Sequence, residues 1–272
     1  MRQCACIDTL YTELPWEKRF QAAKNDGFES VEFWDWRNHD LDCTRTSAEK
    51  AKIKISGFNG DADFSLIDPK QKEKYLDFLQ QSIAVAKKIG AESVTIHSNA
   101  LGPNGVVVHY YTELSNTVKL CSMYDTLLVC AKLAEESGIQ INLEALNIIT
   151  DHVGNFLQHT QMAAEITRLI HSPKLKILYD IYHMQLNEGS ICDTLHKYHD
   201  QIGHIHVADV PGRHEPGTGE IHYIKIFQCL KSLQYKGRIG YELFPKTHTQ
   251  EAVKAIMSYW NLPDAVPNQE PG

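Results

Sequence analysis

The sequence predicts an α/β protein that folds as a single (β/α)8 TIM barrel over residues 1–260. Short apolar segments typical of strands alternate with helix-like segments, and eight such pairs follow one another without a break in composition. The length of 272 residues also suits one α/β barrel. A doubly wound open sheet is the alternative. It would usually carry a glycine-rich phosphate turn after its first strand, and residues 8–11 (Asp-Thr-Leu-Tyr) are no such turn.

The predicted strands are short apolar runs, and several of them end in a polar residue. The first begins almost at the start of the chain, and the third ends in Asn59-Gly60-Asp61, a sequence typical of a turn. In chain order, the strands are expected at residues 3–7, 30–34, 53–58, 93–97, 140–144, 175–180, 204–208 and 238–242.

The predicted helices are recognised by their end signals and by apolar residues at helical spacing. Pro15 opens the first helix, whereas Asp68 and Pro69 have the residue types of an N-cap and a first helical position. The tail at residues 261–272 is rich in Pro, Asn and Gly and is expected to be loose. In chain order, the helices are expected at about residues 15–25, 47–52, 69–89, 112–137, 156–170, 181–199 (broken), 223–233 and 249–260.

Composition and charge argue against several classes of protein. The formal net charge is -7 and Lys and Arg form no run, so neither nucleic acid nor an anionic membrane is expected as the main partner. No apolar run is long enough to span a bilayer, and no signal region precedes the first strand. Seven scattered cysteines without a Cys-x-x-Cys motif are typical of reduced thiols in a cytoplasmic protein. Cys4 and Cys6 share one face of the first strand and are expected inside the barrel as small apolar fillers.

The segment that most clearly indicates a functional site is residues 203–213 (Gly-His-Ile-His-Val-Ala-Asp-Val-Pro-Gly-Arg). Side chains alternate across a strand, so His204 and His206 share one face and Ile205 and Val207 share the other. Imidazoles on the inner face suit a strand that delivers metal-binding or proton-transferring groups into a pocket. The polar loop that follows has the position of the functional loops in α/β barrels.

Ionisable residues recur at the C-terminal ends of the predicted strands. Barrel strands are parallel, so these ends share one face, which is the face that carries active sites. Carboxylates gathered there would repel one another unless a divalent cation neutralised them. Three carboxylates and one imidazole suit Mn²⁺ or Mg²⁺, with Co²⁺ as a further option, better than a thiol-ligated zinc. The main set is Glu144, Asp180, His206 and Glu242, and Glu32 and His97 are weaker candidates for supporting or substrate-binding groups.

Each of these residues also has an ordinary structural interpretation. A single Glu at a strand end is more often solvated or helix-capping, and a single His is more often a satisfied polar group. Recurrence of the same placement on the fifth to eighth strands favours a site, because chance would scatter such residues over helices and loops. The other histidines lie in predicted helices or loops and are expected at the surface: His39, His109, His152, His159, His171, His196, His199, His222 and His248.

Four motifs lie in the second half of the chain: residues 142–147 (Asn-Leu-Glu-Ala-Leu-Asn), 179–183 (Tyr-Asp-Ile-Tyr-His), 203–213 and 240–242 (Gly-Tyr-Glu). They resemble the xylose-isomerase-like TIM barrels, in particular the hydroxypyruvate isomerases and the ketose 3-epimerases related to D-tagatose 3-epimerase. The resemblance implies one divalent metal, a pair of glutamates as acid and base, and two residues that contact substrate oxygens. By matching motif these are Glu144, Asp180, His206 and Glu242 for the metal, Glu144 and Glu242 for catalysis, and His183 and Arg213 for the substrate.

The chain departs from the family pattern in its first half, so the identity of the substrate stays open. Residues 57–61 and 98–102 are not the sequences usual in hydroxypyruvate isomerases, and Trp34-Asp35-Trp36 replaces a Phe-Pro-Tyr-like run. Arg213 favours a small 2-oxo acid such as hydroxypyruvate, because its planar fork binds carboxylates well. The two tryptophans would instead favour a longer sugar chain, unless they are packing residues. Trp34 and His97 are the further candidates for substrate binding.

A site of this kind suits removal of a proton from the carbon next to a carbonyl, with the metal stabilising the enediolate. Return of the proton to the neighbouring carbon gives an aldose–ketose isomerase. Return to the same carbon from the other face gives a ketose 3-epimerase, and the residues do not decide between the two. The expected partners are a keto-acid or ketose substrate and one metal ion, with homo-oligomerisation left open.

Two other classes of function are considered. An endonuclease IV-type nuclease shares the barrel but needs more His and Glu ligands and a basic DNA-facing surface, which the acidic charge balance opposes. A non-catalytic barrel is disfavoured because competent ligands fill all four metal positions.

Overall fold

The computed structural model describes residues 1–261 and contains a closed barrel of eight parallel strands. Each strand is hydrogen-bonded to the strands before and after it in the chain, and the last closes onto the first. The predicted (β/α)8 fold is therefore confirmed, whereas the predicted loose tail lies, except for its first residue, outside the described residues. The strands are β1 (Arg2–Cys6), β2 (Ser30–Glu32), β3 (Lys54–Asn59), β4 (Ala91–Ile96), β5 (Gln140–Glu144), β6 (Leu175–Asp180), β7 (Ile202–His206) and β8 (Arg238–Tyr241).

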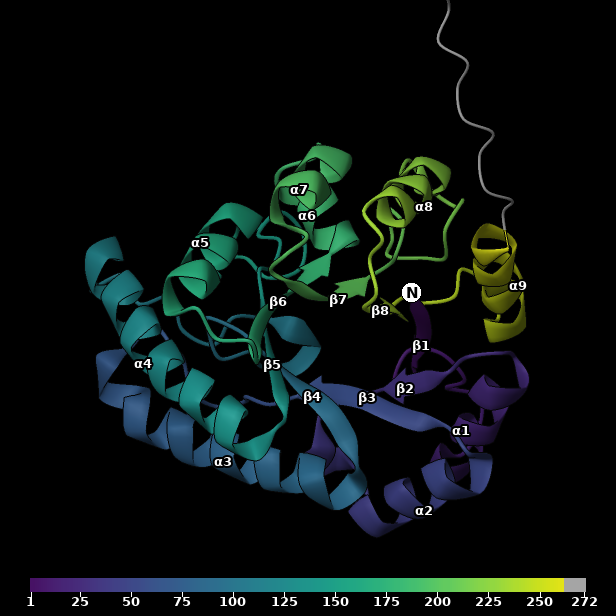
Figure 1. Ribbon diagram of the computed structural model, residues 1–272, viewed down its shortest axis with the longest axis horizontal. Helices are drawn as coiled ribbons and strands as arrows, with labels where there is room; N and C mark the ends of the chain where they lie inside the picture. Colours follow the sequence, from purple (N-terminus) through teal and green to yellow (C-terminus); the bar gives the residue numbers. More distant parts are fainter. Residues whose placement is uncertain (262–272) are drawn as a thin grey trace, which may run out of the picture.

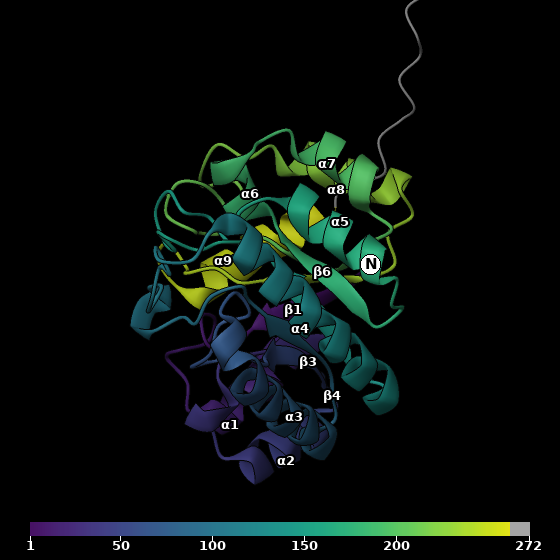
Figure 2. The same cartoon turned by 90° about the vertical axis from the view of Figure 1, so that its left-hand side faces the viewer.

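The helices lie outside the strands and cover the outer surface of the barrel (Figure 1). They are α1 (Trp16–Asn25), α2 (Leu41–Ala51), α3 (Lys72–Ile89), α4 (Asn116–Ser137), α5 (Thr160–Ile170), α6 (Ile181–Asn187), α7 (Ile191–Tyr198), α8 (Tyr223–Ser232) and α9 (Thr249–Trp260), with short 3-10 helices at Trp36–Asn38, Pro69–Gln71 and Pro103–Gly105. Figure 2 shows the long helices α3 and α4 packed side by side. Within residues 1–261, no helix has the length and apolar character needed to cross a membrane.

Capping side chains explain where several helices begin. Asp40 accepts hydrogen bonds from the backbone N–H groups of Asp42 and Cys43, so α2 begins at Leu41, earlier than the expected residue 47. Ser115 accepts from Val118 N and starts α4 at Asn116, four residues later than expected. These caps depend on side-chain contacts that apolar spacing does not reveal.

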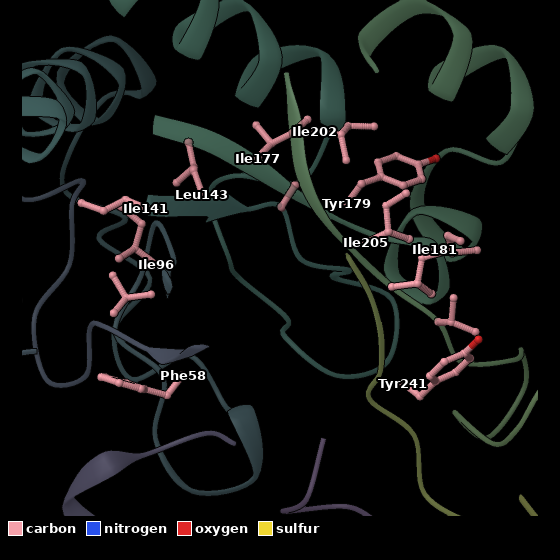
Figure 3. Packing of buried hydrophobic residues seen from close by; sticks show 14 of the residues in the cluster. Phe58, Ile96, Ile141, Leu143, Ile177, Tyr179, Ile181, Ile202, Ile205 and Tyr241 are labelled. Atoms are coloured by element: carbon pink, nitrogen blue, oxygen red, sulfur yellow. The ribbon is translucent and has the colours of Figure 1, made fainter. Parts of the chain in front are cut away.

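The apolar core lies between the strands and the helices (Figure 3). In β5, Ile141 and Leu143 belong to this core and are fully buried. Because side chains alternate along a strand, the intervening residues of β5 point into the barrel. The same alternation places Ile205 of β7 in the core and turns its neighbours His204 and His206 inward, as predicted.

The inside of the barrel has polar groups near β1. Cys4 and Cys6 are fully buried, as predicted, and Cys4 Sγ lies 2.9 Å from Ser56 Oγ. Burial raises the pKa of both thiols well above the ordinary value, with Glu32 as a further cause. The two cysteines therefore stay protonated, which suits residues that fill space inside the barrel better than residues that react as thiolates.

Candidate active site

Side chains from four successive strands converge at the C-terminal end of the barrel. Glu144, Asp180 and His206 are the last residues of β5, β6 and β7, and Glu242 follows β8 directly. One ligand atom from each of the first three lies within 4.8 Å of the other two. Glu242 Oε2 lies 3.3 Å from His206 Nδ1. The structure thus brings the four predicted metal-binding residues together, and all four are buried.

Arg213 lies among these carboxylates. Its guanidinium donates to Glu242 Oε2 and lies 3.4 Å from Asp180 Oδ2. Burial alone would raise the pKa of Glu242, but Arg213 and His206 lower it well below its usual range. Burial raises the pKa of Asp180 in spite of Arg213, with Glu144 adding to the rise. The cluster therefore still favours additional positive charge at Asp180.

The loop after β7 holds Arg213 in place through Asp209. The buried Asp209 carboxylate accepts four backbone hydrogen bonds, which tie the two ends of the loop together. Arg213 itself has a left-handed backbone with φ of 57°, which is uncommon for a residue other than glycine and needs such support. The donors are the N–H groups of Val210 (2.9 Å), Gly217 (2.9 Å), Gly219 (3.0 Å) and Ile221 (3.0 Å).

His206 lies between two groups of carboxylates. Its Nδ1 faces Asp180 at 3.8 Å as well as Glu242, and its Nε2 lies 3.2 Å from Glu32 Oε1. The second Glu32 oxygen lies 2.8 Å from His204 Nε2. Burial would lower the pKa of His206, but Glu32 and Glu242 raise it well above its usual value. Glu32 therefore supports His206 from inside the barrel.

His97, the first residue after β4, uses both ring nitrogens on carboxylates. Its Nδ1 lies 3.0 Å from Asp61 Oδ1 and its Nε2 lies 3.1 Å from Glu144 Oε2. Burial would lower the pKa of His97, but Asp61 and Glu144 raise it to about 10. This position favours an orienting role on Glu144, and a substrate contact by His97 stays a prediction. Sequence reasoning did not single out Asp61, although it noted the Asn59-Gly60-Asp61 turn at the end of β3.

His183 faces the same cluster from α6. Its Nε2 lies 3.6 Å from Asp180 Oδ2 and 3.9 Å from Glu144 Oε1. Its Nδ1 lies 2.7 Å from Asn147 Nδ2. Burial lowers the pKa of His183 well below its usual value, and Arg213 lowers it further. The ring therefore lies beside the cluster, and its contact with substrate oxygens stays a prediction.

The expectation that His152 lies at the surface is wrong. Its side chain is only 6% exposed, and its ring centroid lies 5.1 Å from that of His183. The buried position results from the loop of residues 102–108, because His152 Nδ1 lies 2.7 Å from the Gly105 carbonyl oxygen. No periodic signal marks such a contact between two loops.

Trp34 lies at the mouth of the barrel beside Glu242. Its indole N–H donates to Glu242 Oε1, and its backbone N–H donates to Asp8 Oδ2 at 2.8 Å. The ring centroid lies 6.2 Å from that of Phe244, which is 45% exposed. Trp34 therefore both holds a candidate catalytic carboxylate and offers an aromatic surface near the opening.

The residues of the cluster fit a divalent cation. Glu144 Oε1 and His206 Nδ1, the ring nitrogen that faces Asp180 and Glu242, are buried and have no partner with hydrogen-bond geometry within residues 1–261. Buried polar atoms are normally partnered, so unpartnered ones that converge are typical of a place for an ion or a water. Carboxylate oxygens with one imidazole are donors that hard and intermediate divalent cations accept.

A closed parallel barrel with ionisable groups gathered at its C-terminal mouth is the arrangement of the barrel enzymes. The chain belongs to the xylose isomerase-like TIM barrel family, whose profile matches residues 20–260. It is 27% identical to the hydroxypyruvate isomerase of Escherichia coli (strain K12) over 95% of this chain and 99% of that protein. It is 28% identical to a 2-oxo-tetronate isomerase of Pectobacterium atrosepticum over 92% and 94% of the two chains. The prediction that the chain is an isomerase is confirmed at the level of the family.

Solved structures confirm the fold independently. An AP endonuclease of family 2 from Brucella melitensis superposes with a TM-score of 0.85 at 23% identity over 95% of this chain and 98% of its own. D-psicose 3-epimerase from Clostridium cellulolyticum H10 gives a TM-score of 0.76 at 19% identity over 94% and 90%. The IOLI protein, solved with a zinc atom, gives 0.77 at 18% identity over 96% of both chains. At these identities the likeness shows the barrel alone.

Proposed function

We propose that the protein is an intramolecular isomerase that moves a proton between neighbouring carbons of a small hydroxy-carbonyl acid, in the manner of a hydroxypyruvate isomerase. One observation carries the proposal: Glu144 and Glu242 lie at the ends of β5 and β8 and flank Asp180 and His206 from two sides. A pair of carboxylates on two sides of a substrate can remove a proton and return it elsewhere. The relatives named hydroxypyruvate isomerase and 2-oxo-tetronate isomerase support a small oxo acid as the substrate.

Glu242 suits the role of base and Glu144 that of its partner. The lowered pKa of Glu242, caused by Arg213 and His206 against the opposing effect of burial, keeps this carboxylate ionised near neutral pH. Trp34 and Arg213 fix both of its oxygens, which holds the base in one orientation. His97 holds one oxygen of Glu144, Oε2, and leaves Oε1 without a partner within residues 1–261. One carboxylate would take the proton from the first carbon, the other would deliver a proton to the neighbouring carbon, and exchange with solvent would restore both before the next turnover.

Glu144, Asp180, His206 and Glu242 would hold one divalent cation, which we expect to be Mn²⁺ or Mg²⁺, with Co²⁺ as a third option. Bound there, the cation would polarise the substrate carbonyl and stabilise the enediolate that forms when the proton leaves. The zinc atom of one structural neighbour makes Zn²⁺ a further ion to test.

Arg213, His183, His97 and Trp34 would bind and orient the substrate. Arg213 suits a carboxylate, because its guanidinium presents parallel N–H donors. His183 directs its Nε2 toward the cluster. Trp34 would cover the apolar face of the substrate at the mouth. His97 would act mainly through Glu144, since both of its nitrogens already have partners.

The experiment is a screen of metal-free protein, reloaded with each of the four cations, against small keto acids and ketoses in D₂O. We expect turnover of a hydroxy-oxo acid that requires the cation, with the carbonyl moved to the neighbouring carbon and deuterium on the former carbonyl carbon. A complete lack of exchange into every substrate, with the metal bound, would contradict the proposal.

A ketose 3-epimerase is the second candidate, and Trp34 is the observation that favours it. Its ring, beside the exposed ring of Phe244, offers a surface on which a longer sugar chain could pack. The same D₂O experiment separates the two functions. Deuterium on the carbon that lost its proton, with inverted configuration and the carbonyl unmoved, identifies an epimerase.

Nuclease activity has weaker support. A net charge of -7 opposes binding of a phosphate backbone. A gel-shift assay at low salt with duplex DNA tests this alternative, and we expect no shift.

A further inference from the structure

Asn147 contacts the inner face of His183 at the short distance of 2.7 Å between Nδ2 and the ring Nδ1. Both side chains are buried, with exposed fractions of 0% for Asn147 and 1% for His183. Asn147 lies three residues beyond the end of β5, and His183 lies in the first turn of α6. A buried amide beside a ring nitrogen determines which ring nitrogen carries the proton, provided that the amide itself has only one orientation.

The surroundings of Asn147 fix that orientation. Its Oδ1 accepts from Thr150 N at 3.0 Å, from Thr150 Oγ1 at 3.1 Å and from Asp151 N at 3.2 Å. Its Nδ2 donates to Asp151 Oδ2 at 2.8 Å as well as to His183. A reversed amide would point its N–H groups at the two backbone donors and its oxygen at a carboxylate. The reversal would replace several hydrogen bonds with repulsive contacts, so Nδ2 must face His183.

Because an N–H group faces it, Nδ1 of His183 has to be the accepting nitrogen. A neutral ring then carries its proton on Nε2, the nitrogen that faces Asp180 and Glu144. Arg213 also approaches Nε2, at 3.5 Å, and would favour the opposite tautomer. The 2.7 Å contact with Asn147 is much shorter and both of its partners are buried, so it outweighs the contact with Arg213.

The same hydrogen bonds oppose a second possible metal site, which lies beside His183. Asp151, His152 and His183 offer ligand atoms within 4.8 Å of one another, a spacing that could hold a metal. The NH₂ group of Asn147, however, already bonds to both Asp151 and His183. A cation placed among them would face these N–H groups.

We propose that Asn147 is a positioning residue that keeps the proton of His183 on Nε2 and thereby makes His183 a hydrogen-bond donor to a substrate oxygen. The substrate group that meets His183 must then be an acceptor: a carbonyl, a carboxylate or a developing alkoxide. This inference rests on the proposed function in one respect, namely that His183 contacts the substrate. The tautomer itself does not depend on which reaction the site performs.

The test is the nitrogen spectrum of the histidine side chains in the ¹⁵N-labelled, Mg²⁺-loaded protein near neutral pH. We expect His183 to show a protonated Nε2 and an unprotonated Nδ1. Asn147→Asp replaces the facing N–H group with a carboxylate oxygen, so a proton should appear on Nδ1. The same variant should lower kcat/KM by about 10- to 100-fold, the loss expected when one buried hydrogen bond is misdirected.

Asn155→Asp is the matched control. Asn155 is equally buried in the same loop, but its amide bonds to Ser98 and Leu157 and not to His183. It should leave the His183 spectrum unchanged. In a His183→Gln background, Asn147→Asp should cost little further activity, because the residue it positions is absent.

A wild-type spectrum with the proton on Nδ1, or on both nitrogens, would overturn the inference even if Asn147→Asp failed to fold. An unchanged tautomer in Asn147→Asp would do so as well. If the wild-type tautomer is as expected but no oxo acid or ketose is turned over, the proposed function fails and the role of Asn147 on the ring stands.

Discussion

Glu242 makes more polar contacts than an ordinary residue at a strand end would. The indole of Trp34 and the guanidinium of Arg213 each hold one of its oxygens, and His206 lies 3.3 Å away. Burial opposes ionisation, but these partners more than offset it, and the pKa falls. At the residue scale, therefore, an ionised and buried carboxylate is kept in one orientation.

Replacement of Glu242 or Glu144 with Gln should mainly lower kcat, by about a hundred- to ten-thousand-fold, because the shape is kept and the proton-accepting group is lost. Steady-state kinetics on the substrate found by screening measures the effect. Glu113→Gln, at an exposed position, serves as the control and should retain wild-type rates. A Glu242→Gln variant with nearly unchanged kcat would rule out the two-glutamate mechanism.

His97 should make stability depend on pH in the metal-free protein. Its pKa is raised to about 10 by Asp61 and Glu144 against the opposing effect of burial, and the unfolded chain titrates near about 6.5. A raised pKa gives a contribution that is complete below the unfolded value and lost as pH rises through the folded one. The difference in unfolding free energy between wild type and His97→Asn should therefore shrink from about pH 6 to about pH 10.

Urea denaturation in EDTA at several pH values measures this difference. His196→Asn, which replaces an exposed histidine, should follow the wild-type curve. A difference between wild type and His97→Asn that stays constant or grows with pH would show that His97 is not held as a cation.

The sequence was enough to predict the residues at the strand ends and not the residues that hold them. Glu144 and Asp180 stand at the ends of apolar runs, so the direction of parallel strands alone places them at one mouth. The role of Asp61 depends on how the loop after β3 folds back to His97, and that of Asn147 on hydrogen bonds within its own loop. Neither contact is marked by a periodic pattern in the sequence. The contact that buries His152 is not marked by one either, so the sequence predicted a surface position for it.

At the scale of elements, the loop after β7 is ordered by one buried carboxylate. Asp209 accepts hydrogen bonds near the start of the loop and again near its end, so it fixes the segment that carries Arg213. Turn-forming residues predicted a loop here, but the apolar pattern does not show that the loop is closed around Asp209.

Asp209→Asn should destabilise the protein by about 2–4 kcal/mol, because an amide N–H would then face backbone donors in a buried place. The free energy of unfolding from urea denaturation measures it, with the exposed Asp193→Asn as the control. Activity should fall as well, since Arg213 would lose its fixed position. Unchanged stability would mean that the loop is held by other contacts.

At the scale of the whole molecule, the two halves of the barrel contribute different kinds of residue to the candidate site. Strands β5 to β8 end in or directly before the four candidate ligands, and β2 to β4 supply groups that support them. Glu32 at the end of β2 contacts His206, and the Asp61–His97 pair after β3 and β4 contacts Glu144. Closure of β8 onto β1 brings these groups from distant parts of the chain to one mouth.

The measurement that tests this account most directly is an anomalous-scattering map of crystals of the protein, purified without chelator and soaked in Mn²⁺. We expect one strong peak per chain, ligated by Glu144, Asp180, His206 and Glu242, with Arg213 moved away from Glu242. A matched crystal of Asp180→Asn should show a weaker peak. No peak among the four residues, or a peak ligated by Glu32 and His204 in their place, would contradict it.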